Sequence, residues 1–244
     1  MRGQGCGGES DRRRSRKENM TDNHKICFIT CVNDEILYEK CIDFIKRLIV
    51  PPNIAIEYKA VRDASSMCEG YNKAMAESDA RYKVYLHQDV YITYSYFIHR
   101  LLKLFEDLTI GLAGVIGART LTESCVWWES DYKYGRVIET TLGFPRELKH
   151  PTRWNNKYEE VVVVDGLLIA TQYDVPWRAD ILKGWHFYDI SQCLEFRRAG
   201  YKVVVPNQPC SQVMHRCGSN RTDYFIYRDI VKAEYGAEIL KTQI

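Results

Sequence analysis

Short apolar runs alternate with helically spaced apolar residues through the first half of this 244-residue chain, and no other feature of the sequence constrains the fold as strongly. Buried or alternating strands are predicted at residues 25–32, 54–61, 81–90 and 110–118. Helices are predicted at residues 36–49, from Ser65 or Ser66 to Met75, and at residues 96–108. Alternation of this kind predicts βαβ units and a mostly parallel sheet, which is an α/β fold.

The second half of the chain has a less regular pattern. Residues 119–160 are rich in aromatic and charged side chains and carry few periodic signals, so we expect a long insertion of loops and short irregular elements. The mixed pattern of this second half also predicts some antiparallel pairing of strands. Further strands are predicted at residues 161–171 and 202–206, and further helices at residues 190–198, which Gly200 would end, and at 223–240.

The start of the chain differs in composition from the rest. Residues 1–23 mix Gly, Arg, Ser and Glu without periodicity, which predicts a disordered leader ahead of a single domain over residues 24–244. Residues 1–25 hold seven basic and four acidic side chains, whereas the remainder holds 27 basic and 28 acidic ones. Because the domain has no basic excess, we do not expect nucleic acid as its partner.

Signals for membranes and export are also missing from the sequence. No run of 18 apolar residues occurs, so no transmembrane helix is expected, and the first 25 residues lack the apolar stretch of a secretory signal. The nine cysteines are scattered through apolar segments, which predicts reduced, buried side chains and a cytoplasmic location. A zinc site of Cys210, His215 and Cys217 with Cys27 and Cys31 is a minor alternative, because the spacing matches no standard finger.

Polar and ionisable side chains follow the ends of the predicted strands. In α/β folds, ligands bind at the carboxyl ends of strands, so these residues predict a nucleotide-and-metal site at one edge of the sheet. They include Thr30, Val32, Asn33, Arg62, His87, Gln88, Asp89, Asp165, Gly166, Trp185, His186, Asp189 and His215.

Three of these residues have side chains suited to specific chemistry. Asp89 follows a buried strand and is a candidate ligand for Mg²⁺ or Mn²⁺, although a turn or helix-capping role is an equal alternative. His215 is a candidate second ligand, with a structural histidine as its alternative. Asp189 follows four large side chains that would exclude water and raise the pKa of the carboxyl, which suits a general base; a helix-capping role is compatible with this.

Several common motifs are absent or incomplete. Gly111, Gly114 and Gly117 do not have dinucleotide-loop spacing, and we interpret them as small residues that allow strands to pack closely. Neither a phosphate-binding P-loop nor a G-x-S-x-G nucleophile elbow occurs. The pair Trp127 and Trp128 belongs either to the core or to a surface that stacks on a sugar ring.

A series of ordered segments resembles a known family over residues 25–218. The segments are KICFITCVND, SSMCEGYNKAM, VYLHQDV, VVVVDGLLIAT, GWHFYDISQCLEFRRAGYKVVVP and VMHR. Together they resemble the inverting glycosyltransferases of the family 2 type with the GT-A fold, and more narrowly a small bacterial glycosyltransferase-like group. The resemblance implies a Rossmann-like, three-layer α/β fold with a mostly parallel central sheet.

The resemblance also implies roles for individual residues. Asp89 matches the last Asp of the D-x-D metal motif, whose first Asp is replaced here by His87, and His215 matches a histidine that contacts the metal or pyrophosphate. Asp189 matches the catalytic base, while Ser191 replaces the second acid of that stretch. The implied nucleotide-sugar contacts are Thr30, Val32, Asn33, Arg62, Asn72, His87 and Gln88, and the implied acceptor side holds Asp165, Gly166, Trp185 and His186.

The implied activity is the transfer of a sugar from a nucleotide-diphospho-sugar donor to a saccharide or other hydroxyl acceptor, assisted by Mn²⁺ or Mg²⁺, with inversion at the anomeric carbon. Two alternatives remain open at this point. One is a weakly active or inactive relative that binds nucleotide-sugar or glycan, which the replacement of an Asp by His87 keeps in play. The other is a nucleotidyltransferase on a similar sheet.

Overall fold

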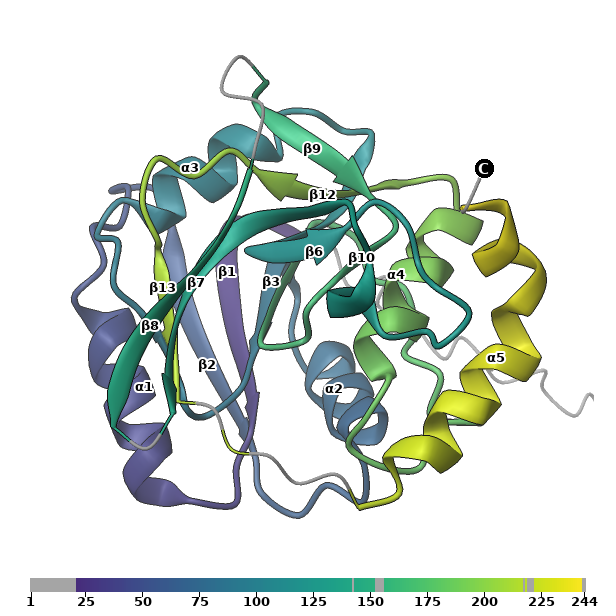
Figure 1. The fold of residues 1–244 in the computed structure, drawn as a ribbon. Helices are drawn as coiled ribbons and strands as arrows, with labels where there is room; N and C mark the ends of the chain where they lie inside the picture. Colours follow the sequence, from purple (N-terminus) through teal and green to yellow (C-terminus); the bar gives the residue numbers. More distant parts are fainter. Residues whose placement is uncertain (1–20, 142, 152–155, 217, 219–221, 243–244) are drawn as a thin grey trace, which may run out of the picture.

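The computed structural model describes residues 21–141, 143–151, 156–216, 218 and 222–242, and it forms an α/β fold with two sheets (Figure 1). The predicted leader lies almost wholly outside the described residues. The helices are α1 (Glu35–Lys46), α2 (Met67–Ala76), α3 (Phe97–Leu104), α4 (Tyr188–Arg198) and α5 (Tyr224–Lys241), with a 3₁₀ turn, η1 (Trp127–Glu129).

The larger sheet has seven strands in the order β2-β1-β3-β11-β5-β12-β9. Three of its six pairings are parallel (β1 with β2, β1 with β3, β5 with β12), and three are antiparallel. The expectation of a mostly parallel sheet was therefore wrong, because β11 runs antiparallel between β3 and β5. The strands are β1 (Asp22–Cys31), β2 (Ala55–Val61), β3 (Ala80–Leu86), β5 (Ile110–Gly114), β9 (Tyr158–Val161), β11 (Leu168–Thr171) and β12 (Lys202–Pro206).

The smaller sheet has six strands in the order β10-β6-β7-β13-β4, with β8 paired to β7. Two segments that were predicted as single strands are divided: residues 110–118 form β5 and β6, and residues 161–171 form the end of β9, β10 and β11. The remaining strands are β4 (Val90–Ile92), β6 (Ile116–Ala118), β7 (Lys133–Thr141), β8 (Phe144–His150), β10 (Val163–Val164) and β13 (Val213–His215).

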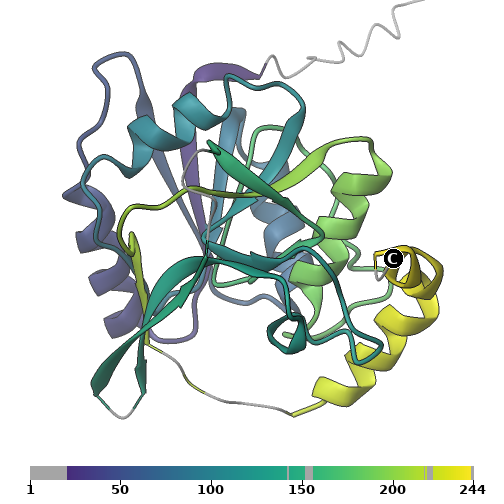
Figure 2. The ribbon, with the colours of Figure 1, turned by 45° about the horizontal axis from the view of Figure 1, so that its top comes forward.

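The segment 119–160 is not the irregular insertion that we expected. It contains an antiparallel hairpin of β7 and β8, which projects on the side of the molecule opposite α5 (Figure 2). Strand β8 is exposed along most of its length, so it has no alternating apolar pattern to reveal it. Its position is set by hydrogen bonding to β7, which periodicity in the sequence cannot report.

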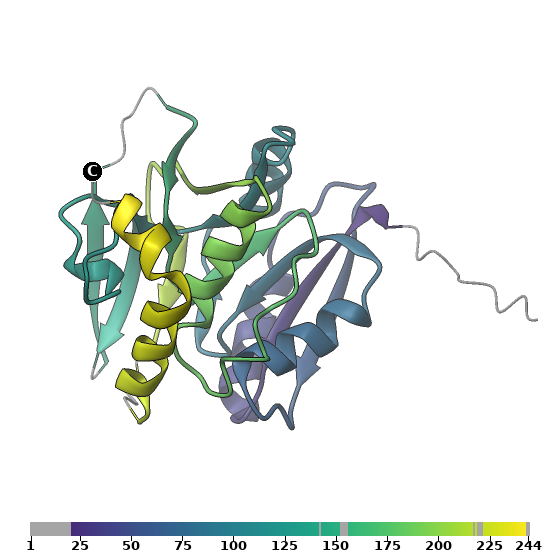
Figure 3. The same ribbon diagram turned by 90° about the vertical axis from the view of Figure 1, so that its right-hand side faces the viewer.

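The helices flank the larger sheet. Helix α2 packs against β1 and β2, and α4 packs against β12 and β5. Helix α5 packs on α4, so that α4 lies between α5 and α2 when the molecule is seen from the side (Figure 3). Side chains cap two of the helices: Asp34 accepts a hydrogen bond from the Leu37 amide at 3.1 Å, and Ser66 accepts one from the Glu69 amide at 3.2 Å.

The glycines of β5 and β6 confirm the prediction of close packing. A Cβ on Gly114 would lie 2.4 Å from Val164, and one on Gly117 would lie 2.2 Å from the carbonyl oxygen of Val163. A larger residue at Gly117 would force β6 and β10 apart, and one at Gly114 would push β5 away from β10. Gly200, at φ +85°, follows α4 as predicted for a helix stop.

Candidate active site

A cavity of about 660 Å³ opens at the carboxyl ends of β1, β2 and β3, where the sequence placed a site. The opposite wall comes from the segment before α4 and from the start of α5. Eight of the predicted site residues line it: Val32, Asn33, Arg62, His87, Gln88, Asp89, Trp185 and His186.

Gln88 fixes the shape of one wall of the cavity. Its side-chain oxygen accepts hydrogen bonds from the backbone amides of Asn33 and Asp34, each at 2.9 Å, and its amide nitrogen donates to the side-chain oxygen of Asn33. The loop after β1 is thereby tied to the loop after β3. Nearby, Arg62 binds both carboxylate oxygens of Glu35, at 2.7 and 3.1 Å, so its guanidinium is held at the rim.

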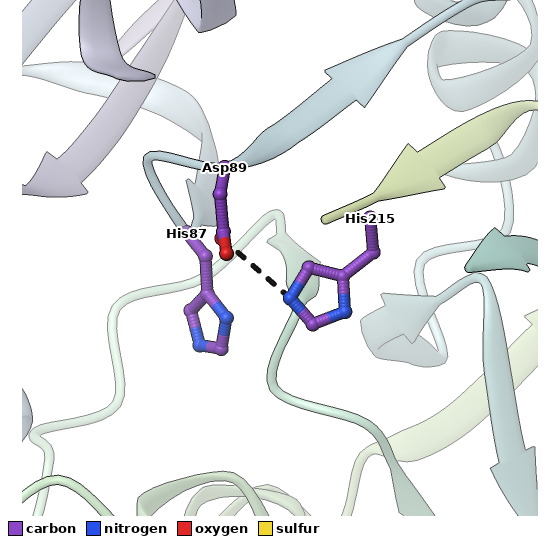
Figure 4. Close-up of side chains that lie close together, drawn as sticks. All are labelled: His87, Asp89 and His215. Carbon is purple, nitrogen blue, oxygen red and sulfur yellow. Dashed lines mark ion pairs between the residues drawn. The ribbon is translucent and has the colours of Figure 1, made fainter. Parts of the chain in front are cut away.

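His87, Asp89 and His215 form a cluster of possible metal ligands, in which one ligand atom from each lies within 4.8 Å of the others (Figure 4). It is the sole such cluster of three or more among the residues that the structure describes. His87 and Asp89 come from the turn after β3. His215 ends β13, which pairs antiparallel with β4 and so sets His215 opposite Val90.

The charge of Asp89 is maintained by its histidine neighbour. Burial by itself would raise the pKa of Asp89, but the hydrogen bond and charge of His215, 3.5 Å away between Nε2 and Oδ1, outweigh it and hold the pKa below its ordinary value. Asp89 is therefore ionised at neutral pH. An ionised carboxylate between two imidazoles is a plausible donor set for a divalent cation.

His87 is held neutral by burial and is oriented by its contact with Tyr188. Burial, followed by the charge of His215, lowers the pKa of His87 to about 4. Its Nε2 lies 2.5 Å from the Tyr188 hydroxyl, which donates to the carbonyl oxygen of Gly166 at 3.1 Å. A Cβ on Gly166 would lie 2.3 Å from this hydroxyl, so glycine leaves the space that Tyr188 occupies.

Asp189 stands in the first turn of α4, next to Tyr188. Its Oδ2 accepts a hydrogen bond from the Gly166 amide at 3.0 Å. Burial, with a smaller effect from the charge of Asp165, raises the pKa of Asp189 to about 7. The side chain is half-buried rather than sealed. A partly accessible carboxyl with this pKa can accept a proton near neutral pH.

The residue that precedes α4 is Phe187, so Asp189 does not cap the helix. Phe187 has φ +61°, in the left-handed region, which costs a large side chain of the order of 1 kcal/mol or more. It is buried, and its ring lies 4.7 Å from that of Tyr224 at the start of α5. Packing against α5 therefore stabilises the strained turn that presents Tyr188 and Asp189.

Asp165 is anchored by its own hydrogen bonds. Its Oδ2 accepts from the indole of Trp127 at 3.0 Å, and its Oδ1 accepts from the Leu167 amide at 2.8 Å. Trp127 is a core residue, in agreement with one of the two interpretations of this pair, whereas Trp128 is 48% exposed. Asp165 thus contributes a fixed negative charge near Asp189.

Other predicted residues are not among those that line the cavity. Thr30 is buried inside the sheet, because β1 continues to Cys31. Asn72 uses both ends of its side-chain amide on the backbone of Trp177, at 2.8 and 2.9 Å. Asp165, Gly166, Asp189 and His215 are not lining residues either; the last three connect to the cavity through hydrogen bonds or the ion pair with Asp89.

Tyr188 is a site residue that sequence reasoning missed. It appeared only as one of four aromatic residues before Asp189. Its fully buried ring lies in an aromatic cluster with Tyr71 and Trp177, while its hydroxyl reaches the metal-ligand cluster. The close approach to Gly166 is the one sequence-level signal, since a glycine beside an Asp at a strand end indicates tight backbone packing.

Most of the described cysteines are buried, as predicted, but Cys31 is half-buried and Cys210 is exposed. The seven described cysteines are free thiols, and five of them are fully buried. Cys31 lines the cavity, but burial raises its pKa to about 12, so it is no thiolate nucleophile at neutral pH. The zinc alternative included Cys217, which lies outside the described residues. Within the described part of the chain, no helix is long and apolar enough to cross a membrane.

Known structures share this fold. The mannosyltransferase PcManGT from Pyrobaculum calidifontis, solved with GDP-Man and Mn²⁺, aligns with a TM-score of 0.53 and 12% identity over 86% of this chain and 62% of its own. TarS 1–349 of S. aureus, solved with UDP, aligns with a TM-score of 0.51 and 8% identity over 86% of this chain and 65% of its own. At these identities the similarity shows the fold alone, which is the GT-A fold.

Sequence comparison adds a family. The streptomycin biosynthesis protein StrF of Streptomyces griseus is 26% identical over 194 residues, which are 76% of this chain and 64% of StrF, so this chain spans less than two thirds of that relative. Residues 27–235 match the model of a group described as a glycosyltransferase-like family. Because this match runs from β1 into α5 and includes every residue of the site, the chain belongs to the glycosyltransferase-like family.

Proposed function

We propose that this protein transfers a sugar from a nucleoside-diphosphate-sugar to a hydroxyl acceptor, with inversion at the anomeric carbon and with Asp189 as general base. One observation supports this most: Gly166 donates its amide to Asp189 and accepts from the Tyr188 hydroxyl, which contacts His87, so a chain of three hydrogen bonds links Asp189 to a cluster suited to a divalent cation. A charge-neutralising centre and a proton acceptor on two adjoining elements are what such a transfer needs.

The donor would lie in the cavity at the ends of β1 to β3. Val32, Asn33 and Gln88 would flank the nucleotide base, because the bonds of Gln88 make this wall rigid before any ligand arrives. Thr30 and Asn72 would support the site from outside, through the sheet and through α2. Lys183 and Arg62 line the same cavity, where Lys183 supplies positive charge and the charge of Arg62 is paired with Glu35.

The diphosphate side is where His87, Asp89 and His215 converge. Their donor set and spacing fit Mn²⁺ or Mg²⁺. A bound divalent ion supplies Lewis acidity that stabilises the departing diphosphate. The protein's own contribution is to keep Asp89 ionised through His215, to keep His87 neutral through burial, and to hold His87 in place through Tyr188.

The acceptor would approach Asp189 from the side of Asp165, Gly166, Trp185 and His186. Trp185 is 46% exposed on the cavity wall, so it offers an aromatic face on which a sugar ring can stack. Asp189 would take the proton of the attacking hydroxyl as the bond to the anomeric carbon forms and the bond to the diphosphate breaks. The fixed charge of Asp165 helps to keep Asp189 basic.

The test measures turnover and binding separately. Release of nucleoside diphosphate is followed for a panel of donors with Mn²⁺, beginning with GDP-mannose and UDP-linked sugars, the ligand types found in the two similar structures. Donors that bind are identified first by thermal shift, since binding to the native state raises the melting temperature. We expect Asp189→Asn to lower turnover by about 10² to 10⁴-fold, with donor affinity retained.

Asp43→Asn is the matched control, because Asp43 is an exposed residue of α1 away from the cavity. Unchanged turnover in Asp189→Asn would remove Asp189 from the role of base. Donor binding without turnover in the wild type, across the donor and acceptor panel, would favour a binding protein instead. Pyrophosphate release from a nucleoside triphosphate would favour a nucleotidyltransferase.

A further inference from the structure

A row of aromatic side chains leads outward from the wall of the cavity, and its members Trp185, Trp128 and Phe225 are exposed. We propose that this row is an extended carbohydrate-binding surface, so that the acceptor is an oligosaccharide rather than a single sugar. The inference rests on the proposed function in taking the Asp189 side of the cavity as the acceptor side. It adds the class of acceptor and the residues that bind its outer sugar units.

The row begins inside the cavity and continues without a gap to the outer surface. Trp185 and His186 line the cavity ahead of α4. The ring of His186 lies 5.3 Å from that of Tyr224, at the start of α5, between centroids. Tyr224 in turn lies 6.4 Å from Trp128 of η1 and 5.6 Å from Phe225. These are the spacings of aromatic rings in contact.

Trp128 is firmly held although its side chain is 48% exposed. Its neighbour Trp127 is buried and donates its indole N–H to Asp165 at 3.0 Å, and the Lys133 ammonium donates to the carbonyl oxygen of Trp128 at 2.9 Å. The segment that carries η1 lies beside α5 in all three ribbon views (Figures 1, 2 and 3). An exposed ring on an ordered backbone loses little conformational freedom when it binds a ligand.

The bond between Trp127 and Asp165 also places the row relative to the proposed chemistry. Asp165 is the charged neighbour of Asp189, and it is fixed by the indole of the residue that precedes Trp128. An acceptor whose reacting hydroxyl lies at Asp189 would therefore extend its next sugar units toward Trp128 and Phe225. A single sugar would use Trp185 alone.

The make-up of the surface favours a carbohydrate as its occupant. A sugar ring has apolar C–H faces that pack on aromatic rings, and hydroxyl groups at its edge that need polar partners. The Arg228 guanidinium lies 4.9 Å from the centroid of the Phe225 ring and is paired with Asp229 at 2.7 Å, so polar groups of both signs border the row. An anionic membrane surface would instead attract a cluster of unpaired basic side chains.

The experiment measures saccharide binding to the full chain by calorimetry, with no donor present. The probes are single sugars and the corresponding oligosaccharides built from hexoses, N-acetylhexosamines and uronic acids. We expect the wild type to bind an oligosaccharide of this panel about tenfold or more tightly than its single sugar. Trp128→Ala should remove this advantage and leave the affinity for the single sugar unchanged.

Two control variants separate stacking from general damage. Trp128→Phe keeps an aromatic ring and should retain most of the affinity for the oligosaccharide. Phe144→Ala removes a side chain that is 79% exposed on the β7–β8 hairpin, on the side of the molecule opposite α5, and should leave binding unchanged (Figure 2). Thermal melting of Trp128→Ala close to that of the wild type would show that the fold is intact.

Several results would overturn the proposal. They are an absence of saccharide binding across the panel, equal affinity of the wild type for single sugars and oligosaccharides, and full oligosaccharide affinity in Trp128→Ala. Binding to anionic lipid vesicles that Trp128→Ala abolishes would assign the row to a membrane surface instead. Because no donor is used, this surface can be refuted while sugar transfer succeeds, and it can be verified while transfer fails.

Discussion

Two carboxyl groups of the candidate site, those of Asp89 and Asp189, have their pKa values shifted in opposite directions by their surroundings. Asp89 follows β3 beside His215, whose hydrogen bond and charge overcome the effect of burial and keep its pKa low. Asp189 begins α4 beside another acid, Asp165, and burial raises its pKa to about 7. The same side chain is thus fitted to hold a cation in one place and to accept a proton in the other.

The comparison shows that burial raises the pKa of both carboxyl groups, and that at Asp89 the neighbour His215 overcomes this effect whereas at Asp189 the neighbour Asp165 adds to it. Both carboxyls are half-buried, yet one faces an imidazole and the other a carboxylate. Groups whose environments push their pKa values apart are typical of acid–base sites. The predictions below alter Asp89, Asp189 or one of their neighbours, from the largest expected effect to the smallest.

Removing the carboxylate of Asp89 should have the largest effect on turnover. Asp89→Asn deletes the sole charged oxygen ligand of the cluster, and we expect metal-dependent turnover to fall by about 10² to 10³-fold, which corresponds to several kcal/mol of lost stabilisation. Donor turnover is measured across a Mn²⁺ titration, and Asp43→Asn, at an exposed position of α1, provides the control. Full activity at low Mn²⁺ concentration would contradict a ligand role for Asp89.

Gly166→Ala tests the contact of Gly166 with Tyr188, through which Asp189 is linked to His87. The added Cβ would lie 2.3 Å from the Tyr188 hydroxyl, so that ring must shift, and we expect a loss of about 1 to 3 kcal/mol in the free energy of unfolding. Gly236→Ala is the matched control, because nothing lies within 4 Å of its Cβ in α5 and it should stabilise by about 0.5 to 1 kcal/mol. Urea denaturation measures both variants; equal stability of the two would refute the close contact.

The charged form of the Asp189 carboxyl should lower the free energy of unfolding at high pH. Since the pKa of Asp189 is about 7 in the fold, above the ordinary value of 3.8, its neutral form stabilises the fold below about pH 4 and that contribution is lost as the pH rises through 7. Asp189→Asn should therefore exceed the wild type in stability at pH 8 by about 1 kcal/mol or more.

Urea denaturation at pH 5 and pH 8 tests this expectation. The advantage of Asp189→Asn should be small at pH 5 and larger at pH 8, whereas Asp43→Asn should show no such trend. A variant less stable than the wild type at pH 8 would show that the charged carboxyl is well accommodated.

The smallest change concerns the neighbour that raises the pKa of Asp189. Asp165→Asn removes the negative charge while keeping an oxygen for the Trp127 indole, so the pKa of Asp189 should fall. The rate of transfer by the wild type should rise with pH to half its maximum near pH 7, and this midpoint should move to lower pH in the variant. A midpoint that stays in place would exclude Asp165 as a cause.

Much of the first half of the fold could be predicted from sequence because its signals are local. The apolar run of β1, the cap residues Asp34 and Ser66, and the helical spacing of α1 are all properties of adjacent residues. The direction of β11 could not be predicted, since antiparallel pairing between β3 and β5 depends on residues far apart in the chain. The exposed strand β8 left no apolar pattern at all.

The site was predicted unevenly for the same reason. Residues directly after strands, such as Gln88 and Asp89, were recognisable because strand ends converge at one edge of a sheet. Thr30 follows the same rule but lies one residue too early, inside β1. Tyr188 could not be recognised, because its function depends on a hydrogen bond to a residue 101 positions away.

The central claim, that the two carboxyl groups have different states and tasks, is tested most directly by titrating both in one protein. Carbon-13 spectra of selectively labelled aspartate, with Asp89→Asn and Asp189→Asn used for assignment, follow each carboxyl with pH. The account predicts that Asp189 titrates near pH 7 and that Asp89 titrates below the ordinary range of an aspartate. Two carboxyl groups that titrate together near pH 4 would contradict it.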